Sequence, residues 1–332
     1  MVSLLAACGG GGGGGSDEPA PVATQLTITS NNQQAVSAEA VQVAEGSSMV
    51  ADLGGSVVTG VQVSAASVLP GPVLLGGVAL KLLSMAPAAP AMATGVTETV
   101  SETCSGGGSA TVKMTSSSPS AVVPGDAVSI TANNCVETIN GSTVRLNGSL
   151  SLEIAAGSFD PDSVVYPKDL TLHMTAGNFT MDTVTLSGSM DLRLVQTSAM
   201  FGSVTLTAPS MSWKDAALND THRVTLKNYT HHVEHTTVDT SRIQVTGTVE
   251  TDSVRIGAGL VSFDLNTPEP IVVNTLFGGM VIGGSLQVTG KNSGLLLTVV
   301  GNDTFELKLD ANGDGTPEAT STVTRAQLRT LR

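Results

Sequence analysis

The most concentrated group of potential metal ligands in this chain is a histidine cluster. Four of the five histidines belong to it: His222, His231, His232 and His235. Within it, HHVEH matches HxxEH, a zinc-binding pattern that needs a helix to bring both outer histidines together. The surrounding residues are rich in β-branched types, which favour a strand. On a strand, His231 and His235 share one face, but zinc would need His222 or Asp239 from a neighbouring strand. We expect an exposed polar hairpin, with zinc at His231 and His235 as the alternative.

A second group of potential ligands lies in DANGDGTPE, residues 310–318. Its oxygen-bearing side chains belong to Asp310, Asn312, Asp314 and Glu318. Their spacing around Gly315 resembles the calcium loops of EF-hands. The twelfth position is Ser321 rather than a bidentate glutamate, and strands are expected at 305–309 and 320–324. The Asn-Gly and Asp-Gly pairs are also typical of hairpin turns. The segment therefore predicts a hairpin loop, either with a surface calcium site or as a simple turn.

No other segment carries the residues of a familiar catalytic site. The sequence has no GxSxG or SxxK motif, no phosphate-binding glycine loop before a helix, and no carboxylate pair with an evident role. The Gly106–Gly108 run is better interpreted as a loop. We expect a protein without catalysis and without a cofactor, calcium excepted.

The composition indicates a folded, water-compatible protein. The chain has 332 residues, of which 13% are charged, with 37 glycines and a net charge of −13. Such a chain is too apolar for disorder and long enough to bury a core. Its acidity argues against nucleic acid as a partner, because nucleic-acid recognition needs a basic surface.

The first residues carry the clearest motif. Leu5, Ala6, Ala7 and Cys8 spell LAAC, and seven glycines follow, Gly9–Gly15. This start resembles the lipobox of bacterial lipoproteins, particularly the β-rich envelope lipoproteins of proteobacteria. The resemblance implies that Cys8 becomes the mature first residue and carries acyl chains that hold the protein at a membrane. Gly9, in place of Asp, implies sorting to the outer membrane, on its periplasmic or cell-surface side.

The export signal before the lipobox looks truncated. Only Met1 to Leu5 precede the motif, whereas a full signal has a basic start and an apolar stretch of roughly 7 to 15 residues. We therefore expect that the true start codon lies upstream or that the sequence has been trimmed.

The remaining cysteines agree with export. If Cys8 is acylated, Cys104 and Cys135 form an even pair, as is typical of an oxidising compartment. We expect a disulfide between them, with two buried free thiols as the alternative.

The chain divides into a lipobox (1–8), a disordered Gly/Pro tether (9–24), an apolar and partly helical segment (25–100) and a β domain (101–332). In the third part we expect a short strand at Leu26–Thr29. A helix capped by Asn31 or Asn32 should follow, with an apolar face of Ala35, Ala38, Val41 and Val43.

The segment 57–93 is strongly apolar, with Lys81 as its one charged residue. Pro70 and Pro72 interrupt it and leave fewer than the roughly 20 apolar residues that a membrane span needs. We expect a helix packed on the domain.

From about Ser101 onward, apolar and polar residues alternate. One phrase recurs with glycine in the apolar register: Leu146-Gly148-Leu150, Leu186-Gly188-Met190, Val245-Gly247-Val249 and Ile282-Gly284-Leu286. Inward glycines let a sheet bend or another layer approach. The pattern predicts a mainly β fold: a large bent antiparallel meander of roughly a dozen strands, as a half-barrel or flattened sandwich, with one or two short N-terminal helices. Four unrelated strands of high β propensity are the alternative.

Three function classes remain open on these observations. The first is a lipid-anchored envelope component with a structural or binding role and an unknown envelope protein or lipid as partner. The second is a carrier of lipid or acyl chains in a concave apolar sheet. The third is a zinc-dependent hydrolase built around His231.

Overall fold

One open β-sheet forms the framework of the molecule. The computed structural model describes residues 22–44, 96–117, 123–139, 142–157, 169–182, 184–196, 202–215, 223–237, 239–274 and 279–331. The strands are β1 (Thr24–Gln25), β2 (Val96–Thr103), β3 (Ser109–Ser116), β4 (Ala127–Ile139), β5 (Ser142–Gly157), β6 (Asp169–Met181), β7 (Val184–Gln196), β8 (Gly202–Asp215), β9 (Arg223–Thr237), β10 (Thr240–Thr251), β11 (Val261–Asn274), β12 (Met280–Gly290), β13 (Ser293–Gly301), β14 (Thr304–Asp310) and β15 (Ala319–Thr324).

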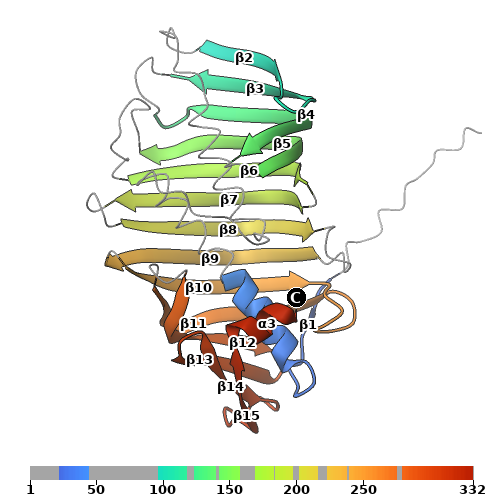
Figure 1. Cartoon of the computed structure of the whole chain (residues 1–332), viewed down its shortest axis with the longest axis vertical. Helices are drawn as coiled ribbons and strands as arrows, with labels where there is room; N and C mark the ends of the chain where they lie inside the picture. Colours follow the sequence, from blue (N-terminus) through green and yellow to red (C-terminus); the bar gives the residue numbers. More distant parts are fainter. Residues whose placement is uncertain are drawn as a thin grey trace, which may run out of the picture.

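The strands follow one another through the sheet in chain order. From β2 to β15 each strand pairs antiparallel with the next, and the short β1 pairs in parallel with β11. Figure 1 shows β2 to β10 as one broad sheet, whereas β11 to β15 curve around two helices. The predicted bent antiparallel meander is confirmed, and all described strands belong to one sheet that stays open at β2 and β15.

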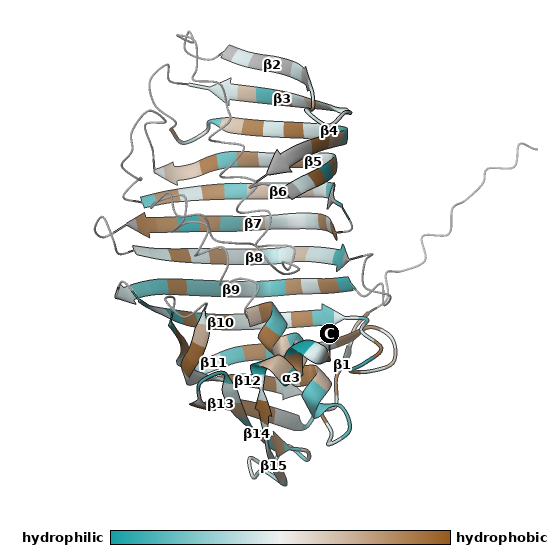
Figure 2. Cartoon of the chain, viewed as in Figure 1, coloured by the Kyte–Doolittle hydropathy of each residue, from teal (hydrophilic) through white to brown (hydrophobic). Residues whose placement is uncertain are grey.

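Alternation places one face of each strand in the core. On β5 to β7, Leu150, Leu172 and Leu186 have no exposed surface. Polar residues lie between them and give the strands the alternating colours of Figure 2. This period of two is the pattern of a sheet with one buried face, and burying such leucines contributes roughly 1.5–3 kcal/mol each.

The glycines of the repeated phrases adopt left-handed backbone conformations. Their φ values are +89° at Gly148, +112° at Gly188, +144° at Gly247 and +99° at Gly284. A Cβ on Gly148 would lie 2.4 Å from the backbone oxygen of Asn178 on β6, and one on Gly188 would lie 2.3 Å from that of Ser210 on β8. Glycine is required at these positions because the backbone has a positive φ and because a Cβ would overlap the neighbouring strand. The group that approaches is a neighbouring strand of the same sheet and not another layer.

The glycines lie beside β-bulges. Register shifts occur at 147–149 between β5 and β6, 176–179 between β6 and β7, 189–191 between β7 and β8, and 246–248 between β10 and β9. Asn134, Asn178 and Asn228 also have φ near +50°, a conformation that asparagine tolerates. We call this line of residues across β4 to β10 the bulge row. Bulges increase twist and bend strands.

The expected alternation of buried and exposed residues does not hold in the fourth repeat, Ile282-Gly284-Leu286. Ile282 is 40% exposed, whereas Val281 is buried. The pairing of β11 with β12 shifts register between Asn266 and Val273, and such a shift exchanges the two faces of a strand. The expectation that Ile282 faces inward is therefore wrong.

The N-terminal segment matches the expected helix but not its details. Residues 33–44 are helical, and the structure describes this segment no further than residue 44. Asn32 does not cap the helix by accepting one of its amides; its Oδ1 accepts the Thr29 N–H, and its Nδ2 donates to the carbonyl of Ile256. The predicted strand at 26–29 is wrong, because the strand residues are Thr24 and Gln25.

A C-terminal helix, α3 (Arg325–Thr330), was not expected. Thr324 and Gln327 form a capping box that begins it, and Leu328 is buried. Six residues give too little periodicity for the sequence to indicate a helix after a strand-forming segment.

Several expectations fall outside the described residues. They concern Cys8, the tether up to residue 21 and the apolar segment around Lys81. Among the described residues, no helix is both long and apolar enough to cross a membrane.

The bulge row generates a stability prediction. Gly148 and Gly125 have nearly the same φ, +89° and +90°, but a Cβ on Gly125 would meet nothing within 4 Å. Gly125→Ala should therefore cost only the left-handed strain, about 1–2 kcal/mol. Gly148→Ala should cost more than ~3 kcal/mol, because the backbone of β6 must also move. Urea unfolding of both variants measures this, and equal losses would contradict the steric role of β6.

Candidate functional site

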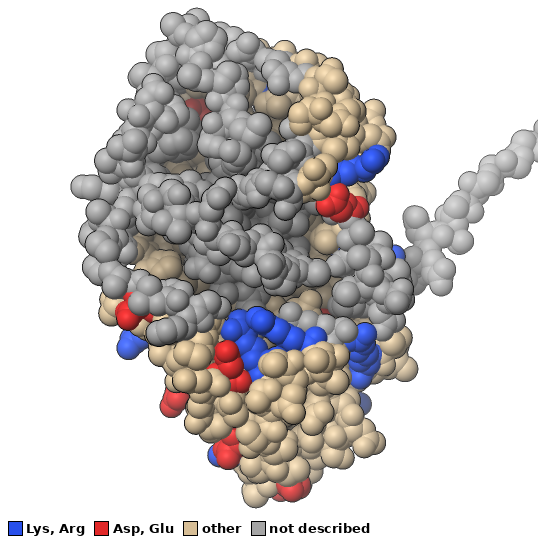
Figure 3. All heavy atoms as spheres, viewed as in Figure 1, with Lys and Arg blue, Asp and Glu red and all other residues tan. Residues whose placement is uncertain are grey.

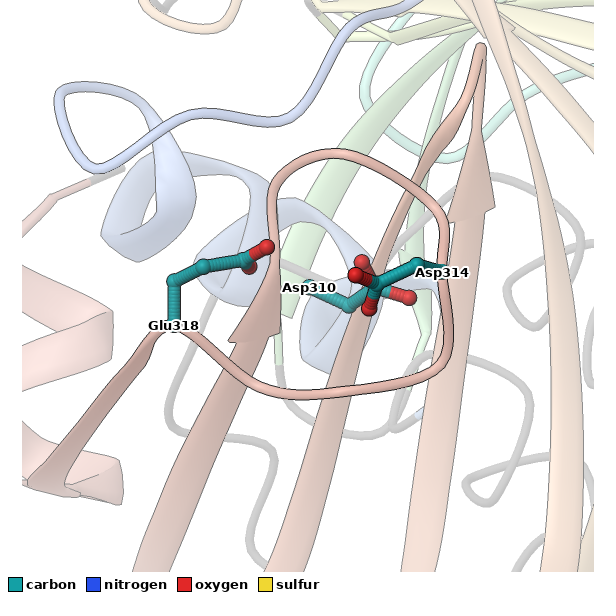
Figure 4. A group of neighbouring side chains, drawn as sticks. All are labelled: Asp310, Asp314 and Glu318. Carbon is teal, nitrogen blue, oxygen red and sulfur yellow. The ribbon is translucent and has the colours of Figure 1, made fainter.

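The acidic hairpin loop brings together three carboxylates. Asp310 ends β14, Glu318 precedes β15, and Asp314 lies between them. One oxygen of each lies within 4.8 Å of the others. Figure 4 shows the three side chains directed toward one another within the loop. In the described part of the chain, no other group of at least three His, Cys, Asp or Glu side chains converges in this way.

Loop amides already bind these carboxylates. Asp310 accepts the N–H groups of Gly313 at 2.7 Å and Gly315 at 2.8 Å. Glu318 accepts the Ala311 N–H at 2.6 Å. The Thr316 N–H donates to Asp314, and this hydrogen bond is the largest of the effects that hold the pKa of Asp314 below its ordinary value. The three carboxylates therefore shape the loop, and the lowered pKa of Asp314 favours its ionised form.

Asn312 has a different role from the three acids. Its Oδ1 accepts the Asp314 N–H at 2.8 Å, and its Nδ2 lies 3.2 Å from Asp314 Oδ2. This is a local turn bond of the kind that asparagine often makes.

The predicted hairpin is present, and the ninth position of the loop, Glu318, supplies the carboxylate that the twelfth lacks. Clustered carboxylate oxygens are the ligands that Ca²⁺ prefers.

The histidine cluster lies on β9 as a strand and not as a helix. His231 and Val233 are buried on the inward face, whereas Glu234 is exposed on the opposite face. Because residues four apart on a strand are separated by roughly 13 Å, His231 and His235 cannot share one zinc ion. His222 lies outside the described residues, and Asp239 accepts hydrogen bonds from Thr237 and Thr240.

His231 is an unusual core residue. Only 2% of it is exposed, and neither ring nitrogen has a hydrogen-bond partner. Its cross-strand neighbours are Leu206 on β8 and Val245 on β10, so no titratable side chain stands opposite it. Burial, assisted by the nearby charge of His232, lowers the pKa of His231 to about 3. The ring is therefore neutral in the folded protein.

A hydrogen-bonded row on the outward face was not predicted. His173 Nδ1 lies 2.6 Å from Asp191 Oδ1, and its Nε2 lies 3.5 Å from Thr175 Oγ1. The order of carboxylate, imidazole and hydroxyl is that of a nucleophilic relay. Both ends of His173–Asp191 are over 40% exposed, and Thr175 pairs with strands on both sides, so its backbone offers no oxyanion donor. No sequence motif indicates this row, because the pairing of β6 with β7 is what brings His173 and Asp191 together.

The two remaining cysteines are joined. Cys104 and Cys135 form a disulfide with a Cα–Cα distance of 5.4 Å, across 31 positions of sequence. It ties the turn between β2 and β3 to β4. A loop of this length stabilises a fold by roughly 3–4 kcal/mol in the chain-entropy model. The predicted pairing is confirmed.

The basic residues near the C-terminus serve the fold. In the view of Figure 3, Lys and Arg atoms gather around α3. Its first residue, Arg325, donates to the Gly279 carbonyl at 2.7 Å and lies 3.4 Å from Asp303. These contacts hold α3 against the end of the sheet.

Comparison with known proteins adds no relative. No protein-family model, curated protein or solved structure matched this chain.

The acidic loop generates a binding prediction. Titration with Ca²⁺ should stabilise the protein against thermal unfolding, by about 2.7 kcal/mol at a concentration 100 times the dissociation constant. Asp314→Asn should remove most of that gain, because one of the converging carboxylates is lost. Asp169→Asn, at an exposed carboxylate paired with Arg193, is the control and should keep it. If Ca²⁺ leaves the unfolding temperature unchanged, the loop is only a turn.

His231 generates a pH prediction. The folded protein keeps it neutral, whereas the unfolded chain protonates it near its ordinary pKa of 6.5. Above pH 6.5 this titration therefore leaves the free energy of unfolding unchanged. As the pH falls from 6.5 toward about 3, protonation of His231 in the unfolded chain lowers the free energy of unfolding by roughly 1.4 kcal/mol per pH unit. His231→Leu should show a correspondingly shallower loss of unfolding free energy in acid.

The control for this measurement is His232→Leu, which leaves the buried ring in place. It should retain most of the slope that His231 contributes, because burial is a larger cause of the lowered pKa of His231 than the charge of His232. Identical acid profiles for the wild type and His231→Leu would contradict the assigned burial of a neutral imidazole.

Proposed function

We propose that this chain is a lipid-anchored protein of the cell envelope with a structural or binding role and no catalysis. The observation that carries the proposal is the LAAC sequence ending at Cys8 and running directly into Gly9–Gly15. Acylation of Cys8 would attach the sheet to a bilayer without a spanning helix, and the glycines would act as a flexible spacer.

The disulfide supports an exported location. Cys104 and Cys135 are bonded to each other, which leaves Cys8 as the one cysteine available for another modification. Disulfides persist in oxidising compartments such as the periplasm or the cell surface.

The burial of the inward apolar side chains favours a structural or binding role over the role of a lipid carrier. The inward side chains of the central strands, such as Leu150, Met174, Met190 and Leu192, are at most 1% exposed without any ligand. A carrier needs an apolar cavity that its cargo can enter. Side chains already withdrawn from solvent fit a filled core better.

The geometry at β9 does not favour the zinc-dependent hydrolase. His231 is enclosed by apolar cross-strand neighbours, and His235 Nδ1 pairs with Ser241 Oγ at 2.9 Å. A catalytic zinc needs three protein ligands and an open position for water. The described residues around His231 do not offer that set.

Mass spectrometry of the protein purified from its bacterial host, expressed from the native gene, tests the proposal. We expect a membrane-associated polypeptide that begins at Cys8 and carries the mass of acyl chains. Cys8→Ser should abolish both the added mass and the membrane association. The double variant Cys104→Ser/Cys135→Ser should lose the disulfide but keep the acyl chains. A mature polypeptide with an unmodified Cys8 would overturn the anchoring.

A further inference from the structure

The sheet ends at β2 with an open edge. Among the described strands, β2 is the terminal strand of the sheet order and pairs only with β3. Cys104 N–H donates to the Gly108 carbonyl, in the same register as the β2–β3 ladder. Because antiparallel partners alternate between bonded and unbonded pairs, the odd-numbered residues from Thr97 to Thr103 turn their N–H and C=O groups away from β3.

Three common devices against strand addition, proline, lysine and a β-bulge, are absent from β2, whereas its two charged residues are Glu98 and Glu102. Its sequence, VTETVSET, contains no proline, lysine or arginine. The ladder to β3 is unbroken from Val96↔Ser116 to Thr103↔Ser109, unlike the bulged pairings of the central strands. Natural edges are commonly protected by proline, lysine or a bulge, so β2 presents a straight template for another strand.

The edge is also held rigid. The disulfide joins Cys104, directly after β2, to β4. Gly106 N–H donates to the Val136 carbonyl at 2.8 Å, and Val136 N–H donates to the Gly107 carbonyl at 2.9 Å. A strand that is already ordered loses less entropy when it binds a partner.

We propose that β2 pairs with β2 of a second copy of this chain, antiparallel about a twofold axis at Thr99, so that the two sheets become one continuous sheet. The self-complementary pattern of the strand favours a second copy over a different partner. With Thr99 opposite Thr99, Thr97 stands opposite Ser101. Both pairs unite exposed hydroxyl residues.

Charge selects this register over the adjacent one. An axis at Thr99 places Glu98 opposite Val100, whereas an axis at Val100 places Glu98 opposite Glu102 twice. Like charges directly opposite each other destabilise a sheet. Hydroxyl pairs already occur on this face between β2 and β3, at 3.3 Å for Thr97–Thr115 and 3.1 Å for Ser101–Thr111. The dimer would extend the same ladder.

The opposite edge is less suited to self-pairing. β15 has six residues, and the acidic loop with Asp310, Asp314 and Glu318 directly precedes it. Two copies joined there would bring two carboxylate groups into proximity. The proposal for β2 does not depend on acylation of Cys8, so either one can fail without the other.

The oligomeric state of the full-length chain, carrying Cys8→Ser to remove the free thiol, tests the pairing. Sedimentation equilibrium should show a dimer. Thr99→Pro should weaken it on the order of 10- to 100-fold, because one outward N–H is lost from each copy while the bonds to β3 remain. Thr99→Val keeps the N–H and should dimerise like the parent. A monomeric parent, or a Thr99→Pro variant that dimerises equally well, would overturn the proposal.

A thiol cross-link in the same background tests the register without relying on proline. Thr99→Cys should be joined to its copy by a short bismaleimide, because directly bonded partners have Cα atoms about 5.5 Å apart. Ser101→Cys should not, because its two copies would lie roughly 14 Å apart along the strands. Preferential cross-linking at Ser101 would overturn the assigned axis.

Discussion

The structure depends on keeping every strand hydrogen-bonded to its neighbours while one face of a very wide sheet stays buried. Backbone groups in the interior of the sheet cannot be left unpaired without cost. The bulge row meets this constraint. Where a strand carries an extra residue, the neighbouring glycine yields space at a positive φ, as Gly148 does for Asn178 and Gly188 does for Ser210. Pairing continues on both sides, and Leu146 and Leu150 both remain inward.

A disulfide lies near one end of this sheet, and a group of carboxylates lies near the other. Near one edge, the Cys104–Cys135 bond fixes the β2–β3 hairpin. Near the other, the carboxylates of Asp310, Asp314 and Glu318 organise the last hairpin through loop amides. The disulfide and the acidic loop thus lie at opposite margins of the described sheet. Its interior holds His231, which is neutral because it is buried.

The alternation of apolar and polar residues was sufficient to predict the fold class, but not the register shift and the short helix that interrupt the alternation. Alternation predicted the meander and the final hairpin. It failed at Ile282, where a bulge exchanged the faces, and at α3, which a local capping box begins. The pairing of His173 with Asp191 depends on the register between β6 and β7, which no local pattern reveals. Convergence of the acidic loop was foreseeable because its residues are adjacent in sequence.

The repeated glycines are the points at which bulged neighbouring strands approach within one sheet. The most direct measurement is the backbone φ of Gly148, Gly188, Gly247 and Gly284, from three-bond HN–Hα couplings and nuclear Overhauser contacts in the isotope-labelled protein. We expect positive φ at all four glycines, with contacts from Gly148 to Asn178 and from Gly188 to Ser210 and Met211. Extended glycines in an unbroken ladder would contradict it.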